Sequence, residues 1–560
     1  MPQRRPSVET GMNRCLQAPE ILQLICSQLP NDRISDRQRL LAVALSCRAL
    51  LEPALDRLWL KIPSFRPIMA TLPTDLWKVD KKWTGANPWT VLGVRRAIVP
   101  TDLDRYIAYY AHRIREVDIG VLKATFSLEV WLGLQMATSW KHGALSPSAQ
   151  KINWALSGSK QAVLWKEVLD QAFPFFSLFM GPNTSYLSFT FASDTTIHAA
   201  SVRSAPGVSS RLKELQLIDV APATSGLSFL TNYLRTTSWN NLEILRIANI
   251  SADAISHLSA LPNLTILEIW SLRDLPRIHV YSDTDWKTPP PHVEEMPNTA
   301  FPSLETLNLT SGSSESIEAF IQHLPPDNYL HTLQCTVNRV EPSGDAMTSL
   351  LASIRLHCDP KSLRKLVLKT GPPLLAFTPI EDLEMQPNEG VNLTPLSVFE
   401  ELEELSLNFS ININLLPADI DFIVESFPLL VKLKVDTNVS DAVVARLDHN
   451  HVLRLLYDLP FLKKLGLRFD ATQITGEETI PASSIHTRPA PLEKLWVGDS
   501  PIYSPEAVIK FLERHCPNLN LNKLETVQLN EEYSHSVPVM VYKRRWMAVR
   551  DSTIVDRESS

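Results

Sequence analysis

The stretch Leu304-Glu305-Thr306-Leu307-Asn308-Leu309 decides the fold, because its L-x-x-L-x-L spacing recurs along the chain. One copy alone would mean little, since leucine is a common residue. The copies lie about 31 residues apart on average, a period typical of solenoid repeats. They begin at Leu212, Leu242, Leu264, Leu304, Leu330, Leu363, Leu402, Leu430, Leu462, Leu492 and Leu524.

Amphipathic stretches separate these copies and predict helices. In residues 316–324 and 505–515, apolar side chains return every three or four positions. Each repeat therefore pairs one strand with one helix. A unit this small cannot bury its own apolar face, so the copies must stack, with parallel strands along the inner wall of an α/β solenoid. Weaker copies around Val117, Ile152 and Leu187, and a helix predicted at 101–112, place the start of the array near residue 101.

Composition limits the classes of partner. The chain has 560 residues, 44% of them apolar, and a net charge of −7, whereas a dedicated nucleic-acid binder normally carries a basic face. No secretory signal follows the basic N-terminus, and no apolar run reaches membrane-spanning length. We therefore expect no nucleic-acid partner, no membrane partner, and a cytoplasmic or nuclear protein.

Motifs for catalysis are missing from the sequence. It contains no GxxxxGK[ST] or GxGxxG phosphate loop, no GxSxG elbow and no HExxH pair. The 6 cysteines are scattered without CxxC pairs, so they predict buried thiols and no metal site. We expect neither an enzyme nor a cofactor; the alternative is an unrecognised site within the insertions.

A different pattern precedes the repeats. Residues 16–60 predict three short helices whose core is too small to stand alone comfortably, which favours docking on a partner. Pro19-Glu20-Ile21-Leu22, then Ser46-Cys47-Arg48, then Glu52-Pro53-Ala54-Leu55 with Leu58-Trp59, resemble the F-box, in particular its fungal form.

The resemblance implies a partner. F-box helices bind a Skp-type adaptor, which bridges to a cullin and a RING protein. The residues that would contact the adaptor or support that contact are Pro19, Ile21, Leu22, Ile25, Leu29, Cys47, Leu58 and Trp59. The alternative is that these helices form an N-terminal cap for the solenoid.

The repeats resemble the ribonuclease-inhibitor-like leucine-rich repeat, which gives a leucine-rich-repeat array preceded by a small all-α F-box-like domain. Val537–Tyr542 is predicted as a terminal covering strand. The expected divisions are a disordered 1–12, an F-box-like domain 13–62, a linker 63–100, a solenoid 101–545 and a polar tail 546–560, with insertions near 272–301, 371–399 and 470–491.

Strand alternation predicts which side chains face the open inner wall. If the leucines point into the core, the residues between them face the open wall. These residues are neutral to acidic in the early repeats and basic in the late repeats. The residues of interest on the late wall are Lys365, Lys369, Lys432, Lys434, Lys464, Arg468, Lys494 and Trp496. Clustered cations pair with carboxylates and phosphates, so this face is a candidate site for an acidic or phosphorylated segment of a protein substrate. The alternative is that these are ordinary solvated positions of a repeat.

Two functions follow from these patterns. The first is the substrate-recognition subunit of a cullin-RING (Skp, cullin, F-box) ubiquitin ligase, which acts by holding a target near the ligase. The second is a leucine-rich-repeat interaction scaffold without a ligase role.

Overall fold

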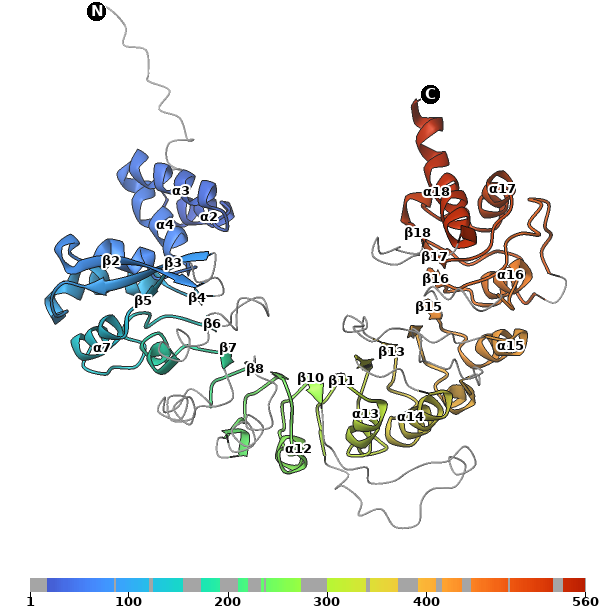
Figure 1. The fold of residues 1–560 in the computed structure, drawn as a ribbon, viewed down its shortest axis with the longest axis horizontal. Helices are drawn as coiled ribbons and strands as arrows, with labels where there is room; N and C mark the ends of the chain where they lie inside the picture. Colours follow the sequence, from blue (N-terminus) through green and yellow to red (C-terminus); the bar gives the residue numbers. More distant parts are fainter. Residues whose placement is uncertain are drawn as a thin grey trace, which may run out of the picture. The chain divides into compact units, whose positions relative to one another are not determined.

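The computed structural model divides the chain into two compact units, Met1–Ile247 and Ala248–Ser560, which are described separately below (Figure 1). The expected disordered residues 1–12 lie outside the described part of the chain. The described residues are 18–84, 87–119, 124–154, 173–191, 210–219, 233–235, 238–272, 300–338, 343–370, 391–408, 415–435, 445–481, 484–526 and 537–558.

The first unit opens with three helices, α2 (Pro19–Gln28), α3 (Ile34–Ser46) and α4 (Arg48–Trp59). Pro19 starts α2 because its fixed φ suits the first helical position and its missing N–H costs nothing there. The Asp36 carboxylate closes the first turn of α3 by accepting a hydrogen bond from the backbone N–H of Arg33, at 3.3 Å. These helices occupy the part of the chain that the sequence predicts to be helical.

The parallel sheet begins earlier than the sequence predicts. Strand β1 (Lys61–Ile62) follows α4 directly and pairs in parallel with β4 (Glu116–Asp118). The predicted start near residue 101 is therefore wrong, because a two-residue strand leaves no periodic signal. Within this unit the strand order is β1-β4-β6-β7-β8-β9. The remaining strands are β6 (Lys151–Trp154), β7 (Tyr186–Phe191), β8 (Glu214–Asp219) and β9 (Ile244–Ile247).

The segment 63–100, predicted as a linker, is folded. It contains α5 (Arg66–Thr71) and the antiparallel pair β2 (Trp77–Thr84) and β3 (Asn87–Val94), and β3 also pairs with β5 (Ala124–Phe126). The buried Trp77 ring stacks on Phe126 with centroids 5.7 Å apart. The aromatic residues of this segment thus pack into the core of the first unit, which a linker would not do.

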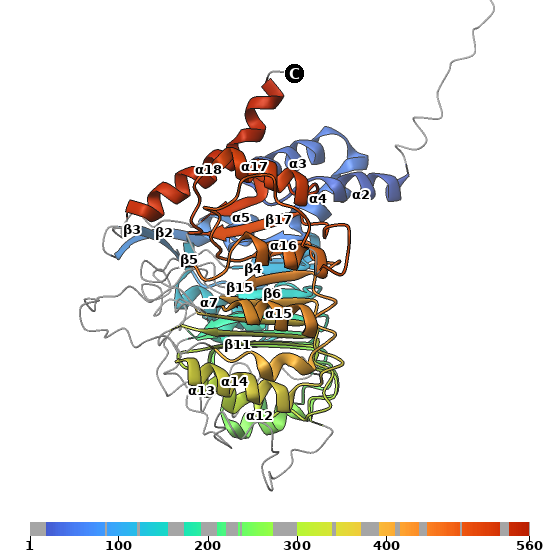
Figure 2. The same cartoon turned by 90° about the vertical axis from the view of Figure 1, so that its right-hand side faces the viewer.

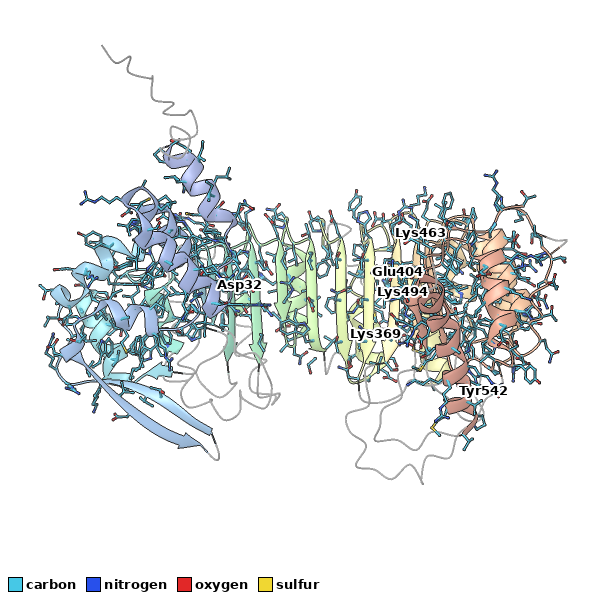
Figure 3. All side chains as sticks on the ribbon, turned by 90° about the horizontal axis from the view of Figure 1, so that it is seen from above. Asp32, Lys369, Glu404, Lys463, Lys494 and Tyr542 are labelled. Atoms are coloured by element: carbon cyan, nitrogen blue, oxygen red, sulfur yellow. The ribbon has the colours of Figure 1, made fainter. Side chains whose placement is uncertain are left out.

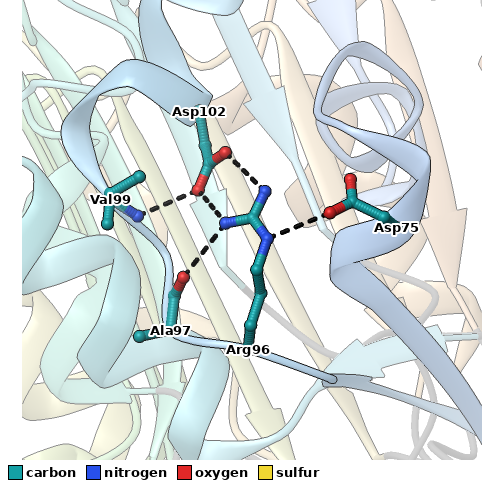
Figure 4. A network of polar contacts seen from close by, with 5 residues as sticks. All are labelled: Asp75, Arg96, Ala97, Val99 and Asp102. Atoms are coloured by element: carbon teal, nitrogen blue, oxygen red, sulfur yellow. Dashed lines mark hydrogen bonds and ion pairs between the residues drawn. The ribbon is translucent and has the colours of Figure 1, made fainter.

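An arginine fixes the turn after β3 (Figure 4). Arg96 donates hydrogen bonds to both carboxylate oxygens of Asp102, at 2.8 and 2.9 Å, and to Asp75 at 3.0 Å. Asp102 also accepts from the backbone N–H of Val99, which starts the short 3-10 helix η2 (Pro100–Leu103). The hydrogen bonds from Arg96 hold the pKa of Asp102 below its usual range.

The helix predicted at 101–112 is broken into three short pieces, η2, α6 (Asp104–Tyr109) and η3 (Ala111–Arg113). A further helix, α7 (Leu128–Ala137), and the 3-10 helix η4 (Phe173–Leu178) follow. Phe65 joins them to the start of the unit, because its ring lies 4.9 Å from Trp131 of α7 and 6.1 Å from Phe179.

The second unit is a stack of parallel strands in the order β10 to β18. The repeated leucines are in register: Leu307 of one strand pairs with Leu333 of the next, and Leu333 with Leu366, and all three are fully buried. This confirms the α/β solenoid. The strands are β10 (Ile266–Leu272), β11 (Thr306–Ser311), β12 (Thr332–Val337), β13 (Lys365–Thr370), β14 (Glu404–Asn408), β15 (Lys432–Val435), β16 (Lys464–Gly466), β17 (Lys494–Gly498) and β18 (Leu524–Thr526).

Helices cover the outer side of these strands (Figure 1), and Figure 2 shows α15 and α16 in front of the strands of their unit. Serine caps begin several of them; Ser313, for example, accepts a hydrogen bond from the backbone N–H of Ser316. The helical elements are α12 (Ala252–Ser259), α13 (Ser314–Ile321), α14 (Gly344–His357), η7 (Thr394–Val398), α15 (Pro417–Ser426), α16 (His449–Asp458), α17 (Pro505–His515) and η8 (Leu521–Lys523).

The end of the second unit differs from the prediction in two ways. Val537–Tyr542 is not a strand, and the predicted polar tail is helical as far as residue 558, because both belong to one helix, α18 (Val537–Glu558). Trp546 and Val549 of this helix are fully buried. The alternating valines of residues 537–541 favour a strand locally. The burial of Trp546 against the rest of the unit stabilises a helix instead.

The last repeat is also shifted. The sequence aligns Leu524 with Leu492, whereas in the structure Leu524 pairs with Leu495, and a further irregularity follows between Trp496 and Gly498. Val527 and Leu529, which complete the predicted copy, lie outside the described residues. The shift brings Glu525 opposite Trp496.

The three predicted insertions are described to different extents. Residues 273–299 and 371–390 lie outside the described part, and 391–399 contains η7. The insertion 470–491 is described except for 482–483. It is anchored at both ends of α17, because Ala471 forms a bridge with Ile502 and the Glu478 carbonyl accepts hydrogen bonds from Arg514 and His515.

Candidate functional site

Helices α2 to α4 enclose a small core. Cys26 and Ala54 are completely buried, and Ala44, Leu22 and Leu40 nearly so. These are short or few side chains, so the buried apolar area is small for three helices. The core holds the helices together without using all of their apolar residues.

The apolar residues left outside this core form what we call the apolar helix surface. On α2, Ile21, Leu24 and Ile25 share one face, because residues three and four apart are neighbours on a helix. Leu24 is 62% exposed, and Ile34 of α3 is 79% exposed. The members of the surface are Ile21, Leu24, Ile25, Ile34, Leu41 and Leu45.

The structure separates the predicted adaptor residues into three groups. Pro19, Ile21, Ile25 and Cys47 are exposed, and Leu29 and Leu58 are half-buried. Leu22 and Trp59 are buried, so they support the helices and are not on their surface. Sequence reasoning missed Leu24, Ile34, Leu41 and Leu45. Their spacing of seven and then four residues in α3 was visible, but it does not reveal which face is covered.

Helix α4 attaches this domain to the segment formed by the end of α6 and by η3 in the same unit. The Trp59 ring lies 4.5 Å from the ring of Tyr110, measured between centroids. The buried guanidinium of Arg113 pairs with Glu52 and Asp56 of α4. These contacts hold α4 in place and leave α2 and α3 to present the apolar helix surface.

The second candidate region is the wall of the second unit formed by β13 to β18. The parallel register aligns one charged residue from each of five successive strands: Lys365, Glu404, Lys432, Lys464 and Lys494. Their neighbours in sequence, the repeated leucines, are buried. Glu404 and Lys494, which β15 and β16 separate, are both labelled in Figure 3.

Two glutamates neutralise part of this charge. Glu404 pairs with Lys432 at 2.6 Å and with Lys365 at 3.0 Å. Burial raises the pKa of Glu404, but the hydrogen bonds from these two lysines outweigh it and leave the pKa below its usual value. Glu525 of β18 pairs with Lys494 at 2.5 Å.

Trp496 lies on β17, the next to last strand of this basic wall. Its indole Nε1–H donates a hydrogen bond to Glu525, at 2.6 Å between the heavy atoms. Glu525 was missed from the sequence, because the shifted register of the last repeat brings it opposite Trp496. A spacing rule taken from the earlier repeats could not have found it.

Arg468 does not belong to this wall, so this part of the prediction is wrong. Strand β16 ends at Gly466, and beyond it the alternation no longer applies. The Arg468 side chain is mostly buried and pairs with the buried Asp499 at 2.7 Å. Lys369 remains at the other end of the wall, as Figure 3 shows, in register with Asn408.

The early part of the array has a different character. In the first unit, Arg246 of β9 pairs with Glu214 of β8. In the second unit, the Trp270 indole donates a hydrogen bond to Glu268 on the same strand, at 2.7 Å. At these positions arginine and tryptophan are matched by carboxylates, so no excess of cations builds up there.

No group of three or more His, Cys, Asp or Glu within the described residues is arranged to hold a metal ion. Among the described helices, none combines the length and apolar character needed to cross a bilayer.

Comparisons with known proteins give distant likenesses. No protein-family model matches the chain, and no curated protein matches it. One similar structure is TLR13 in its complex with ssRNA13, with a TM-score of 0.30 and 13% identity over 77% of this chain and 56% of TLR13. This chain thus matches little more than half the length of TLR13.

A second similar structure is the leucine-rich-repeat-containing protein LegL7 from Legionella pneumophila. The TM-score is 0.24 and the identity 14%, over 73% of this chain and 92% of LegL7. We draw no function from these likenesses. The repeat assignment stands on the register of the buried leucines.

Proposed function

We propose that this protein is the substrate-recognition subunit of a cullin-RING ubiquitin ligase of the Skp, cullin, F-box type. Helices α2 to α4 bind a Skp-type adaptor, and the solenoid binds the target protein. By its resemblance the F-box is of the fungal form, and the ligase would work in the cytoplasm or nucleus. The chain performs no chemistry of its own; it raises the local concentration of the target.

The observation that carries the proposal is the apolar helix surface. Leu24 and Ile34 are large apolar side chains more than 60% exposed, on helices whose core is already complete without them. Exposed apolar patches on soluble proteins mark contacts with other proteins. The same helices resemble the F-box, whose partner is an adaptor, so the surface and the resemblance point to one partner.

The basic wall supports the second half of the proposal. Charged side chains there are aligned on rigid strands, and Trp496 among them is a residue type enriched in binding hot spots. We propose that this wall holds an acidic or phosphorylated segment of the target.

Co-purification with a Skp-type adaptor tests the ligase role. The full chain should retain the adaptor, and the pair Leu24→Glu and Ile25→Glu should lose it, because charge in a desolvated apolar contact is costly. Gln23→Glu is the matched control, since Gln23 is exposed on the same helix and outside the apolar helix surface.

Thermal unfolding of the same proteins distinguishes lost binding from lost folding. Because Leu24 and Ile25 are exposed, the double variant should unfold within a few degrees of the unmodified chain. If the unmodified chain binds no adaptor, the ligase proposal is overturned. A leucine-rich-repeat scaffold is then the better description.

A further inference from the structure

Three ammonium groups converge on one indole ring in the basic wall. The Nζ atoms of Lys494, Lys434 and Lys432 lie 4.5, 5.2 and 6.0 Å from the ring centroid of Trp496. Each gains from the electron-rich face of the ring. Their mutual repulsion nevertheless raises the energy of the folded state, because like charges at short range repel.

Gly466 makes this convergence possible. It lies between Lys434 and Trp496 in the same row of the sheet. A Cβ atom added to Gly466 would come within 2.7 Å of Lys434 Cγ. The stem of Lys434 therefore crosses over the glycine toward Trp496. Any larger residue at position 466 would displace the lysine.

The charges of the cluster do not balance. Five lysines, at positions 365, 432, 434, 464 and 494, face two glutamates, Glu404 and Glu525, which leaves three positive charges in excess. Within the described residues, Lys434 and Lys464 have no carboxylate within ion-pair distance. Burial lowers the pKa of Lys434, Glu525 opposes this, and Lys432 and Lys494 lower the pKa further.

Because its lysines repel one another, this cluster lowers the stability of the folded chain when no partner is bound. Positions that break local rules without a compensating contact are expected at functional sites. An anion bound between Lys434 and Lys464 would supply the missing compensation. The cluster therefore has the properties of an anion site that is complete only when a partner is bound.

The lysines of this wall already bind one kind of anion. The planar fork of arginine suits phosphate and carboxylate alike, and Arg468, the arginine predicted for this wall, is instead paired with Asp499. Lysine pairs with carboxylate at Glu404 and Glu525, so the wall accommodates carboxylate side chains between neighbouring strands.

We propose that Lys434 and Lys464, beside Trp496, bind side-chain carboxylates of an acidic, unphosphorylated segment of the partner protein, and that Gly466 positions Lys434 for this contact. The inference rests on the proposed function, in which this wall holds the target. It narrows the target to a protein with an exposed run of Asp or Glu.

A labelled decaglutamate peptide tests the site by fluorescence anisotropy on the full chain at low salt. Lys434→Met with Lys464→Met should weaken binding by about tenfold, since each exposed or half-buried ion pair contributes on the order of 0.5–1 kcal/mol. Lys463→Met is the matched control; Lys463 is exposed and adjacent in sequence, and Figure 3 places it toward the edge of the sheet. It should leave the affinity nearly unchanged.

Gly466→Ala tests the positioning role, because it removes no charge. It should weaken decaglutamate binding while thermal unfolding shows a folded chain. Unchanged affinity in the double lysine variant overturns the site, and unchanged affinity in the glycine variant overturns the role of Gly466. A neutral peptide with one phosphoserine that binds more tightly than decaglutamate overturns the preference for carboxylate.

Thermal unfolding of Lys434→Met gives a second readout. Removing a half-buried cation beside two others should raise the unfolding midpoint slightly and lower peptide affinity. A lower midpoint would mean that Lys434 stabilises the fold and would contradict the proposal. Both measurements use the chain without adaptor, so their failure leaves the adaptor test unaffected, and loss of adaptor binding leaves this site unaffected.

Discussion

Helices α2 to α4 and helix α18 use apolar side chains in opposite ways. Helix α18 buries Trp546 completely, and the indole Nε1–H donates a hydrogen bond to the Ser500 carbonyl at 2.8 Å. In α2 and α3, Leu24 and Leu45 are 62% and 75% exposed. Both regions are helical and amphipathic, but one completes the core of its own unit and the other leaves apolar surface uncovered.

The difference shows that a helix beside a solenoid need not be a cap. Arg545 also donates to the Ile502 carbonyl and lies over the Tyr503 ring, so α18 satisfies polar and apolar groups of the last repeats. Helix α4 makes comparable contacts through Trp59 and Glu52. Helix α3 adds a hydrogen bond from Arg37 to the Lys61 carbonyl at 3.3 Å, but the large apolar residues of α2 and α3 stay exposed. The cap alternative therefore describes α18 better than it describes α2 and α3.

Trp546→Ala should remove the packing of α18 against its unit and have the largest effect on the unfolding free energy. Removing a completely buried indole should cost about 3–5 kcal/mol of unfolding free energy. Urea unfolding of the full chain measures it, with Met540→Ala as the control, because Met540 lies on the same helix and is 41% exposed. If both variants unfold alike, α18 does not stabilise the second unit.

Arg113→Met should loosen the attachment of α4. It keeps the aliphatic stem but removes the buried guanidinium that pairs with Glu52 and Asp56, at a cost of about 1–3 kcal/mol. Hydrogen exchange should become faster in residues 48–59. Arg39→Met is the control, since Arg39 is 80% exposed and pairs with Asp36 only at 3.8 Å. Equal exchange in the two variants would mean that Arg113 does not hold α4.

Acid should destabilise the C-terminal region because it protonates His515. Its Nδ1 lies 3.0 Å from the Tyr457 hydroxyl, which can donate to it only while the ring is neutral. Burial lowers the pKa of His515, and the hydrogen bond to the Glu478 carbonyl opposes this only in part. The stabilisation is fully present above the unfolded pKa of about 6.5 and is lost as the pH falls toward the folded pKa.

Thermal midpoints measured between about pH 7 and pH 5 test this, because unfolding takes up a proton across that range. Replacing the residue, His515→Gln, should reduce the dependence of the midpoint on pH. A dependence as steep as that of the unmodified chain would exclude His515 as its source.

Leu45→Lys should have the smallest effect on stability and sharpen the comparison most directly. Because Leu45 is 75% exposed, the change should alter the unfolding free energy by less than about 0.5 kcal/mol. Comparing the thermal unfolding of this variant with that of Trp546→Ala contrasts an exposed apolar residue with a buried one. A loss above about 2 kcal/mol would show that Leu45 is packed against the chain.

Much of the fold could be predicted because the repeated signal is strong. Leu433, Leu465 and Leu495 are buried and in register, so the wall positions beside them, including Lys432 and Lys494, are where the alternation predicts. The errors arise where the repeat is interrupted. Strand β1 is too short to have a period, β16 ends before Arg468, and the last strand shifts Glu525 opposite Trp496.

The sequence by itself determined the periodic part of this protein. The spacing of its leucines requires stacked strands, since a single repeat cannot bury its apolar residues. Only the tertiary structure decided which apolar helix face is covered, as Trp546 is and Leu24 is not, and which charges find partners, as Arg468 does. These outcomes depend on contacts between residues far apart in the chain, and local spacing contains no information about such contacts.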